Sequence, residues 1–384
     1  MKFAFYTNSI SPHQLPLAYE MVKVLGDDGY RYVYAGELSL ERRTLGWREC
    51  ENVKWCKQGA NNSEELRNAE VLMSGFRAIT LFEQRAKKGM STIYCSERWF
   101  KPVLGIWRLF VPSYFRMALR FVHLLSSVSK FYYYPMGIHA ARDMARLCGL
   151  VHGDLRCFFR GPRLEFERMP GGRIWVSGEP ENTRKYCLDK MRMWGYFVEE
   201  GLGDRSLELE VKECGSEVLK VLWVGRLLKW KRVDTIIRAV GECAKSKKIT
   251  LDIYGTGPES KRLKKFAAKY GAVIKFYPPV PINDVRKLMR EYDVYVLSSN
   301  GYEGWGAVVS EALEEGMKVV GTYEAGASAT ILPASNLFHA GDWMKLVDIL
   351  SSNIEKTVIG DWTAESAAKV LFSLCGNGHT DDMQ

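Results

Sequence analysis

The sequence predicts an α/β protein made of two doubly wound domains, each built on a parallel sheet. At 384 residues the chain is too long for one ordinary hydrophobic core. Strand-like and helix-like segments alternate in both halves, which is the pattern of two open parallel sheets covered by helices. With 47% hydrophobic and 26% charged residues, the composition is typical of a soluble globular protein.

The first half begins with a short apolar run and a helical pattern at Leu15–Leu25. Further runs have the length and composition of buried strands. The expected strands of this half are Lys2–Thr7, Arg31–Ala35, Glu70–Ser74, Thr92–Ser96 and Phe131–Tyr134.

The second half repeats this alternation. Its expected strands are Leu219–Val224, Thr250–Tyr254, Ile274–Tyr277, Asp293–Ser298 and Lys318–Thr322. Helical patterns separate them at Arg232–Ala244, Glu259–Tyr270 and Asn283–Glu291. Ligands of open parallel sheets bind beyond the carboxyl ends of the strands, so we expect the two domains to face a central cleft.

A polar, acid-rich stretch at 201–216 with three glycines marks the expected domain boundary. We therefore expect an N-terminal domain over 1–210 and a C-terminal domain over 211–360. Residues 361–384 would form a C-terminal helix that could cross back to the first domain, and a frayed tail. The Gly/Pro/Arg-rich stretch 153–187 predicts a loop or hairpin insertion, with one short strand at 173–177.

Composition also narrows the class of protein. Nine cysteines, an odd number, are scattered from Cys50 to Cys375 without metal-ligand spacing, which favours reduced thiols in the cytoplasm. The N-terminus lacks a signal-peptide pattern, and no segment has the roughly 20 apolar residues that span a bilayer. These features together predict a cytoplasmic protein. A net charge of +9 fits an anionic partner. No nucleic-acid-binding motif is present, so we expect that this partner is not a nucleic acid.

The most informative motif is the segment Tyr302–Gly316, a glycine-rich loop that runs into a helix between two expected strands. Unpaired amides and the positive dipole at such a helix start can hold a phosphate. Glu303 in the loop and Glu311 on the helix are poor ligands for phosphate, because carboxylates are anionic, but they are good acceptors of hydrogen bonds from sugar hydroxyls. Together these features predict a site for a sugar attached to a diphosphate.

A second motif follows the expected strand Leu219–Val224, where Gly225 precedes a cluster of cations. Arg226 can present a fork to phosphate oxygens, and Lys231 can supply a point charge. The alternative is a solvated basic loop. The cation cluster lies at a strand's carboxyl end, in the same domain as Glu303, and this position favours the phosphate site.

At this point the chain resembles a known family. Gly225-Arg226 with Lys231, the segment Tyr254–Pro258, and Glu303-x7-Glu311 followed by Gly316 are similar to the donor half of family-four retaining glycosyltransferases of the GT-B fold. This resemblance covers roughly 218–335. A looser similarity to bacterial surface-polysaccharide enzymes involves Asn8–Leu17, Ser96-Glu97-Arg98, Tyr132–Asp143 and Trp194–Phe197.

The resemblance implies a GT-B architecture of two Rossmann-like domains, the first binding the acceptor and the second the nucleotide sugar. It implies that Arg226 and Lys231 neutralise the leaving diphosphate, that Glu303 orients the donor sugar, and that Glu311 binds the ribose. It also implies that backbone around the donor is supplied by Gly225, Gly255, Gly257, Pro279, Gly304, Trp305, Gly306 and Ala307. For Gly255 and Gly257, a plain strand-to-helix turn is an equal alternative.

The resemblance implies no cofactor, because the nucleotide sugar is a substrate. It also implies attack from the front face of the sugar, which needs no pair of carboxylates for double displacement. No Asp-x-Asp motif is evident, so we expect a reaction that does not require metal.

The first domain lacks the family's usual glycine-rich first loop. His13 follows the first strand and could contact the acceptor or the donor phosphate, and His139 follows the strand Phe131–Tyr134 near the expected cleft. A structural or capping role is the alternative for both histidines. Glu97 could reach the acceptor, although a structural ion pair is favoured.

No acidic residue occurs between Arg98 and Arg142. Over 98–121 aromatic side chains interleave with cations, which favours an anionic membrane surface. A core helix pair with a solvated basic face is the alternative. On the membrane reading, the acceptor would be a polyprenyl-linked glycan at the inner leaflet.

The combined prediction is a retaining glycosyltransferase that moves a sugar from a nucleotide-diphosphate donor, a UDP-sugar being favoured, to a glycan or lipid-linked glycan. Bacterial surface-polysaccharide synthesis is the expected setting, in the cytoplasm or peripherally on the inner face of the cell membrane. Two alternatives remain: a catalytically silent glycan-binding or scaffold protein, and a nucleotide-sugar epimerase on the same fold.

Overall fold

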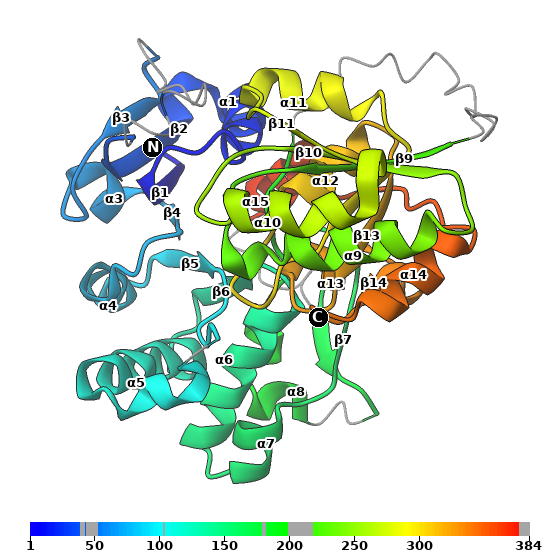
Figure 1. Ribbon diagram of the computed structural model, residues 1–384. Coiled ribbons are helices and arrows are strands. Elements are labelled where there is room, and N and C mark those ends of the chain that lie inside the picture. The colour runs from blue at the N-terminus through cyan, green and yellow to red at the C-terminus, as the bar shows by residue number, and fades with distance from the viewer. Residues whose placement is uncertain (39–42, 44–52, 103, 179–181, 199–217, 376–384) are drawn as a thin grey trace. The chain divides into compact units, whose positions relative to one another are not determined.

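The computed structural model describes residues 1–38, 43, 53–102, 104–178, 182–198 and 218–375 (Figure 1). These residues divide into two compact units. The first contains the described residues up to Phe197 together with those from Gly360 onward, and the second contains those from Val198 to Ile359. The predicted boundary at 201–216 lies outside the described residues.

The first unit is built on a six-stranded parallel sheet in the order β3-β2-β1-β4-β5-β6. All five strands predicted for this half are present, and their bounds, with those of the unpredicted β3, are β1 Phe3–Ser9, β2 Tyr30–Gly36, β3 Cys56–Gln58, β4 Val71–Ser74, β5 Ser91–Ser96 and β6 Phe131–Pro135.

Helices cover this sheet, and buried aromatic side chains join them to it. The ring of Tyr94 on β5 lies 4.6 Å from that of Phe121, whose helix packs on the sheet, and Trp99 packs edge-on against both rings. The helices are α1 Leu15–Gly29, α3 Glu64–Asn68, α4 Ile79–Lys87, η1 Gly105–Phe110, α5 Pro112–Ser127, α6 Ile138–Val151, α7 Leu155–Arg160, α8 Asn182–Lys185, η2 Leu188–Lys190 and α15 Ala364–Ser373.

Two segments complete the first unit. The end of the chain returns to it, because α15 packs against α1. Within the Gly/Pro/Arg-rich stretch, β7 (Leu164–Phe166) and β8 (Ile174–Val176) form an antiparallel hairpin, the second of the two forms expected there.

The second unit has a parallel sheet of the same design, in the order β11-β10-β9-β12-β13-β14. The five strands predicted for this half are present, and their bounds, with those of the unpredicted β14, are β9 Leu219–Val224, β10 Ile249–Tyr254, β11 Ile274–Tyr277, β12 Val294–Leu297, β13 Lys318–Thr322 and β14 Leu337–Phe338.

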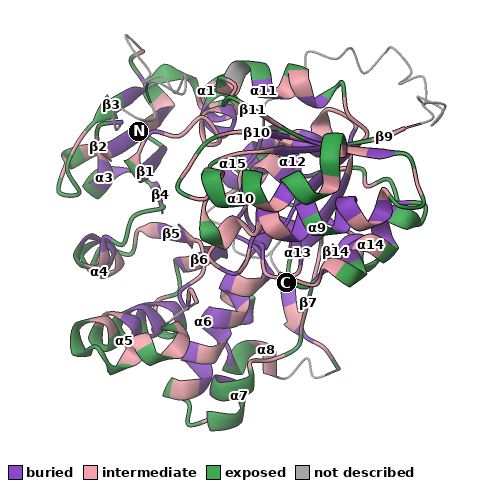
Figure 2. Ribbon diagram, viewed as in Figure 1, coloured by how far each residue is buried: buried purple, intermediate pink, exposed green. Residues whose placement is uncertain are grey.

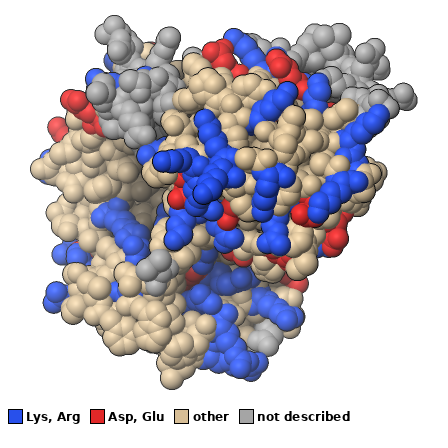
Figure 3. All heavy atoms as spheres, in the orientation of Figure 1, with Lys and Arg blue, Asp and Glu red and all other residues tan. Residues whose placement is uncertain are grey.

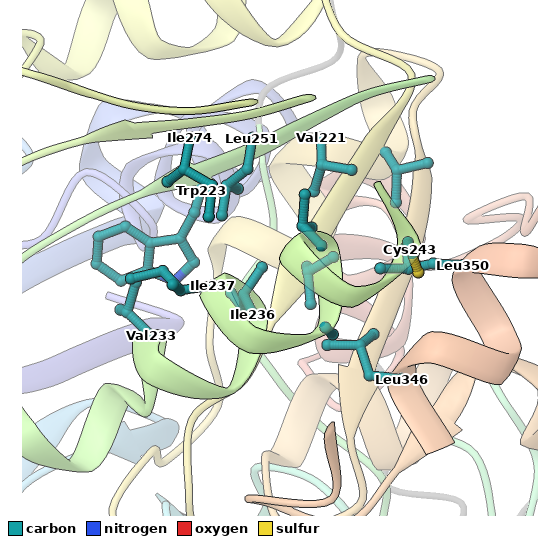
Figure 4. Close-up of a cluster of buried hydrophobic side chains, with 14 of the residues drawn as sticks. Val221, Trp223, Val233, Ile236, Ile237, Cys243, Leu251, Ile274, Leu346 and Leu350 are labelled. Carbon is teal, nitrogen blue, oxygen red and sulfur yellow. The ribbon is translucent and has the colours of Figure 1, made fainter. Parts of the chain in front are cut away.

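Helix α9 packs between this sheet and α14, and Figure 4 shows Ile236 and Ile237 of α9 in the cluster that includes Trp223 and Leu346. Figure 2 shows the same arrangement as buried strands beneath helices exposed on one side. The helices are η3 Lys229–Lys231, α9 Val233–Cys243, α10 Ser260–Ala267, η4 Ala268–Val273, α11 Ile282–Met289, α12 Val308–Glu314, α13 Gly326–Ile331, η5 Ala334–Asn336 and α14 Trp343–Ser351.

The strand order of the second sheet indicates where a ligand would bind. In the second sheet the winding reverses between β9 and β12, which pair directly with Val294 opposite Val221. Open α/β sheets bind ligands beyond the strand ends at such a reversal. Both predicted motifs follow these two strands. Among the described helices, none is long and apolar enough to cross a bilayer.

Candidate functional site

The loops after β9 and β12 meet through an ion pair between Lys231 and Glu303, which lie 72 residues apart in sequence. The two side chains are only 18% and 12% exposed. Ser299 Oγ donates to the same carboxylate oxygen of Glu303 at 2.7 Å. The ammonium of Lys231 also lies 4.5 Å from the ring centre of Trp230. The structure therefore brings together the cation and the acid that the sequence assigned to the diphosphate and the sugar.

Buried hydroxyl groups fix the backbone around this pair. Ser298 Oγ donates to the carbonyl of Lys231 at 2.7 Å, and Thr322 Oγ1 donates to the carbonyl of Ser299 at 2.6 Å. The amide of Asn300 donates to the carbonyl of Trp230 at 2.9 Å. These bonds tie the loops after β9, β12 and β13 to one another.

The sequence reasoning missed Ser298, Ser299 and Thr322. The available signal was small hydroxyl residues directly after a buried strand. Ser299, one of them, stands four residues before Glu303. Without the fold, a serine at a strand end is indistinguishable from an ordinary turn residue.

The glycine-rich loop leads from Glu303 to the start of α12. The carbonyls of Gly304 and Trp305 accept hydrogen bonds from the amides of Gly326 and Ala327 at 3.0 and 2.8 Å. Gly306 has a φ of +89°, a conformation that favours glycine. Within the described parts of the chain, no acceptor is bonded to the amides of Gly304, Gly306 and Ala307. These amides can donate to an anion.

The charges of both predicted carboxylates act on the hydroxyl of Tyr295 on β12. That hydroxyl donates to the carbonyl of Val224 at 3.4 Å, so it marks the carboxyl end of β9. Burial raises the pKa of Tyr295, and the negative charges of Glu303 and Glu311 raise it further. Glu311 lies on the first turn of α12, the helix that follows the loop of Glu303.

The three glycines after β9 and β10 allow two loops to pack backbone to backbone. A Cβ on Gly255 would lie 1.9 Å from the carbonyl oxygen of Gly225, and one on Gly257 would lie 2.5 Å from that of Leu227. The amide of Leu227 donates to the carbonyl of Thr256 at 2.9 Å. Close packing of the loops is thus a sufficient reason for glycine at 255 and 257.

Two further predicted donor residues are accessible. Arg226 follows Gly225 at the end of β9, and its side chain is exposed. Pro279 is also exposed, two residues after β11. In the described part of the chain, no contact joins Pro279 to the Lys231–Glu303 pair, although the adjacent strand ends are linked by Tyr254 and Tyr277, whose rings stack 4.6 Å apart.

In the first unit, the two predicted histidines occupy separate strand ends. His13 lies in the turn before α1, with its ring 5.9 Å from that of Tyr196. His139 is the second residue of α6, directly after β6 and Gly137. Glu97 forms an ion pair with Lys101 at 2.8 Å, the structural role favoured for it from the sequence.

Metal-ligating groups do not gather in the described parts of the chain: no cluster there of three or more His, Cys, Asp or Glu could hold an ion. The seven described cysteines are buried and unbridged.

Residues 207–363 match the family model of glycosyl transferases group 1. An uncharacterized glycosyltransferase of Methanocaldococcus jannaschii is 30% identical over 140 residues, or 36% of this chain and 35% of that protein. The GtfA subunit of the UDP-N-acetylglucosamine–peptide N-acetylglucosaminyltransferase of Streptococcus pneumoniae is 28% identical over 141 residues, or 34% and 27%. The matched stretch spans about a third or less of these curated relatives.

Solved structures resemble the whole chain. HepE of Anabaena in complex with UDP matches 97% of this chain and 95% of its own, with a TM-score of 0.59 and 16% identity. The lipopolysaccharide outer core galactosyltransferase WaaB matches the same shares, with a TM-score of 0.55 and 11% identity. These matches confirm the predicted α/β class and GT-B fold. The match to the glycosyl transferases group 1 model lies within residues 207–363 of this fold.

Proposed function

Given the match to the group 1 glycosyl transferases, we propose that this chain is a retaining glycosyltransferase that uses a nucleotide-diphosphate sugar. One observation carries the proposal: the Lys231–Glu303 pair stands beside a glycine-rich loop with available amides at the reversal of the second sheet. A cation, a sugar-binding acid and anion-binding amides are the groups this donor requires.

In the proposed reaction, Arg226, Lys231 and the amides near Gly306 stabilise the charge that develops on the leaving diphosphate. Glu303, held by Ser299, accepts hydrogen bonds from the donor sugar. Without donor, Lys231 is neutralised by Glu303. We infer that the diphosphate takes over part of this role when donor binds.

The proposed transfer breaks the bond between the anomeric carbon and the phosphate oxygen and forms a bond from that carbon to the acceptor oxygen. The acceptor proton passes to the leaving diphosphate oxygen on the same face, so configuration is retained and no covalent sugar–enzyme intermediate is needed. The cations Arg226 and Lys231 would do the work of a metal, so we propose that neither metal nor cofactor is required.

A UDP-sugar is the favoured donor, supported by the names of the streptococcal relatives and by the UDP bound in the Anabaena structure. The proposed acceptor is a glycan or a polyprenyl-linked glycan of bacterial surface-polysaccharide synthesis. We propose that the reaction runs in the cytoplasm, at the inner face of the cell membrane.

Thermal denaturation with UDP, GDP and their sugars tests the donor. A ligand at 100 times its Kd adds about 2.7 kcal/mol to the free energy of unfolding, enough to raise the midpoint measurably. Lys231→Ala should reduce the shift strongly. Lys229→Ala, which removes an exposed lysine from the same short helix, should preserve it.

The same preparation distinguishes the alternatives. Donor turnover without acceptor would indicate an epimerase. A thermal shift without any turnover, across acceptors, would favour a silent glycan-binding protein. No shift with any nucleotide would overturn the donor site itself.

A further inference from the structure

The surface of η1 and α5 carries an apolar stripe that no described residue covers. Trp107 is 62% exposed and Phe110 is 77% exposed. Val111, Phe115 and Leu119 follow at four-residue spacing and are also exposed, so they share one face of the helix. The side of α5 that borders this stripe is buried in the core by Ala118, Phe121, Val122 and Leu125. The apolar side of α5 is therefore wider than the part that folding buries.

The charges beside this stripe are cationic. Arg116 is exposed, and no described acidic side chain pairs with it. Arg108 lies over the ring of Tyr114 and donates to the carbonyl of Trp99, and it forms no ion pair with an acidic side chain in the described ranges. Two other cations are neutralised, Arg120 by Glu83 and Lys101 by Glu97.

Helix α7 repeats this combination. Leu155 and Phe159 are 57% and 59% exposed. Arg156 and Arg160 lie on the same short helix, are exposed, and form no ion pair with the described residues. Both α5 and α7 pack against α6. Figure 1 places them at one end of the first unit, and in Figure 3 that edge shows Lys, Arg and uncharged surface.

Exposed aromatic rings next to unpaired cations fit one kind of partner better than others. Contiguous apolar patches on a soluble surface mark an interaction site. Aromatic and aliphatic side chains enter the boundary between headgroups and acyl chains, while arginines bind anionic headgroups. A basic protein surface offers no complement to these arginines, whereas an anionic bilayer complements both features.

We propose that η1, α5 and α7 form a lipid-docking face that seats the first unit on an anionic phospholipid bilayer. The docking stands independently of the catalytic site. The proposed function enters in one respect, because a docked enzyme would meet an acceptor carried on a lipid.

Flotation of the full-length chain with vesicles tests this, without nucleotide. Vesicles of phosphatidylcholine are compared with vesicles that also contain phosphatidylglycerol. The chain should float with the anionic vesicles. High salt should weaken its binding, because it shortens the range of attraction between exposed charges to a few ångströms. Binding to neither kind of vesicle would overturn the proposal, as would equal, salt-independent binding to both.

Variants assign the binding to the face. Trp107→Ser with Phe110→Ser should weaken binding at least tenfold. Arg116→Gln and Arg156→Gln should each weaken it about fivefold, the factor expected for one cation near an anionic surface. Met344→Ser is the matched control, because Met344 is 61% exposed but lies on α14 of the second unit. Loss of binding in this control, or full binding in the first variant, would refute the assignment.

A protein partner is the competing occupant. The face is a protein interface, and the lipid proposal fails, if two results are found together. The wild-type chain does not bind vesicles, and Trp107→Ser with Phe110→Ser changes the sedimentation of the free chain. Thermal shifts with UDP-sugars, measured on the same samples, separate the two proposals, since donor binding can persist without docking and docking without donor binding.

Discussion

Replacing Glu303 by Gln separates the two roles that the ion pair gives this residue. Glutamine keeps an oxygen that can accept from Ser299, so the substitution removes mainly the negative charge. Exposed ion pairs contribute about 0–1 kcal/mol to stability, and breaking a buried pair costs about 3–5 kcal/mol. With side chains 18% and 12% exposed, the pair lies between these limits. We expect the free energy of unfolding to fall by about 1–2 kcal/mol, measured by urea denaturation.

The same substitution should affect binding and transfer in opposite directions. In the free wild-type protein the ammonium of Lys231 is neutralised by Glu303, so part of that interaction is lost when a diphosphate binds. Glu303→Gln removes the competitor, and UDP, which carries no sugar, should bind up to about tenfold more tightly, a difference of about 1.4 kcal/mol. Transfer from the UDP-sugar should fall by at least about 100-fold, because the sugar loses a charged acceptor in the transition state.

Calorimetry with UDP and a transfer assay with UDP-sugar measure these two effects. In a Lys231→Met background, Glu303→Gln should no longer change the affinity for UDP, because the cation that it competes for is absent. An unchanged transfer rate would refute the sugar-orienting role of Glu303. Weaker binding of UDP to Glu303→Gln would refute the assignment of Lys231 to the diphosphate.

Three further predictions concern single positions. Gly255→Ala should lower the free energy of unfolding by about 3 kcal/mol or more, because its Cβ would overlap a carbonyl oxygen at 1.9 Å. Gly271→Ala, with open space around its Cβ, should lower it by about 1 kcal/mol. Thermal melts compare the two variants. Arg226→Ala should weaken UDP binding about tenfold or more without changing the melting midpoint, since the side chain is exposed; an altered midpoint would indicate a structural role. The pKa of Asp154 is held below its ordinary value, chiefly by Lys185, so its contribution is present above about pH 4 and is lost as the pH falls further. Asp154→Asn should therefore cost about 1 kcal/mol at pH 7 and progressively less in urea titrations below pH 4; an equal cost at both pH values would contradict this.

Most of the sheet architecture was predictable because strands of a parallel sheet are buried on both faces and leave continuous apolar runs in the sequence. β9, β12 and β13 were found in this way. β3 and β14 were not, because three and two residues are too short to show a pattern. The hairpin of β7 and β8 was expected only as one of two forms, since strands of three residues carry little apolar signal.

The candidate site was only partly readable for a related reason. Glycine before a cation, and an acid in a glycine-rich loop, are local signals that identify Lys231 and Glu303 separately. Their contact depends on the pairing of β9 with β12, a choice of strand order that no local pattern records. The role of Gly255 likewise depends on the pairing of β9 with β10, which sets the distance between loops far apart in sequence. The sequence by itself thus predicted which residues would bind a sugar diphosphate, and the tertiary structure decided which of them meet, because burial leaves a local pattern and long-range contact does not.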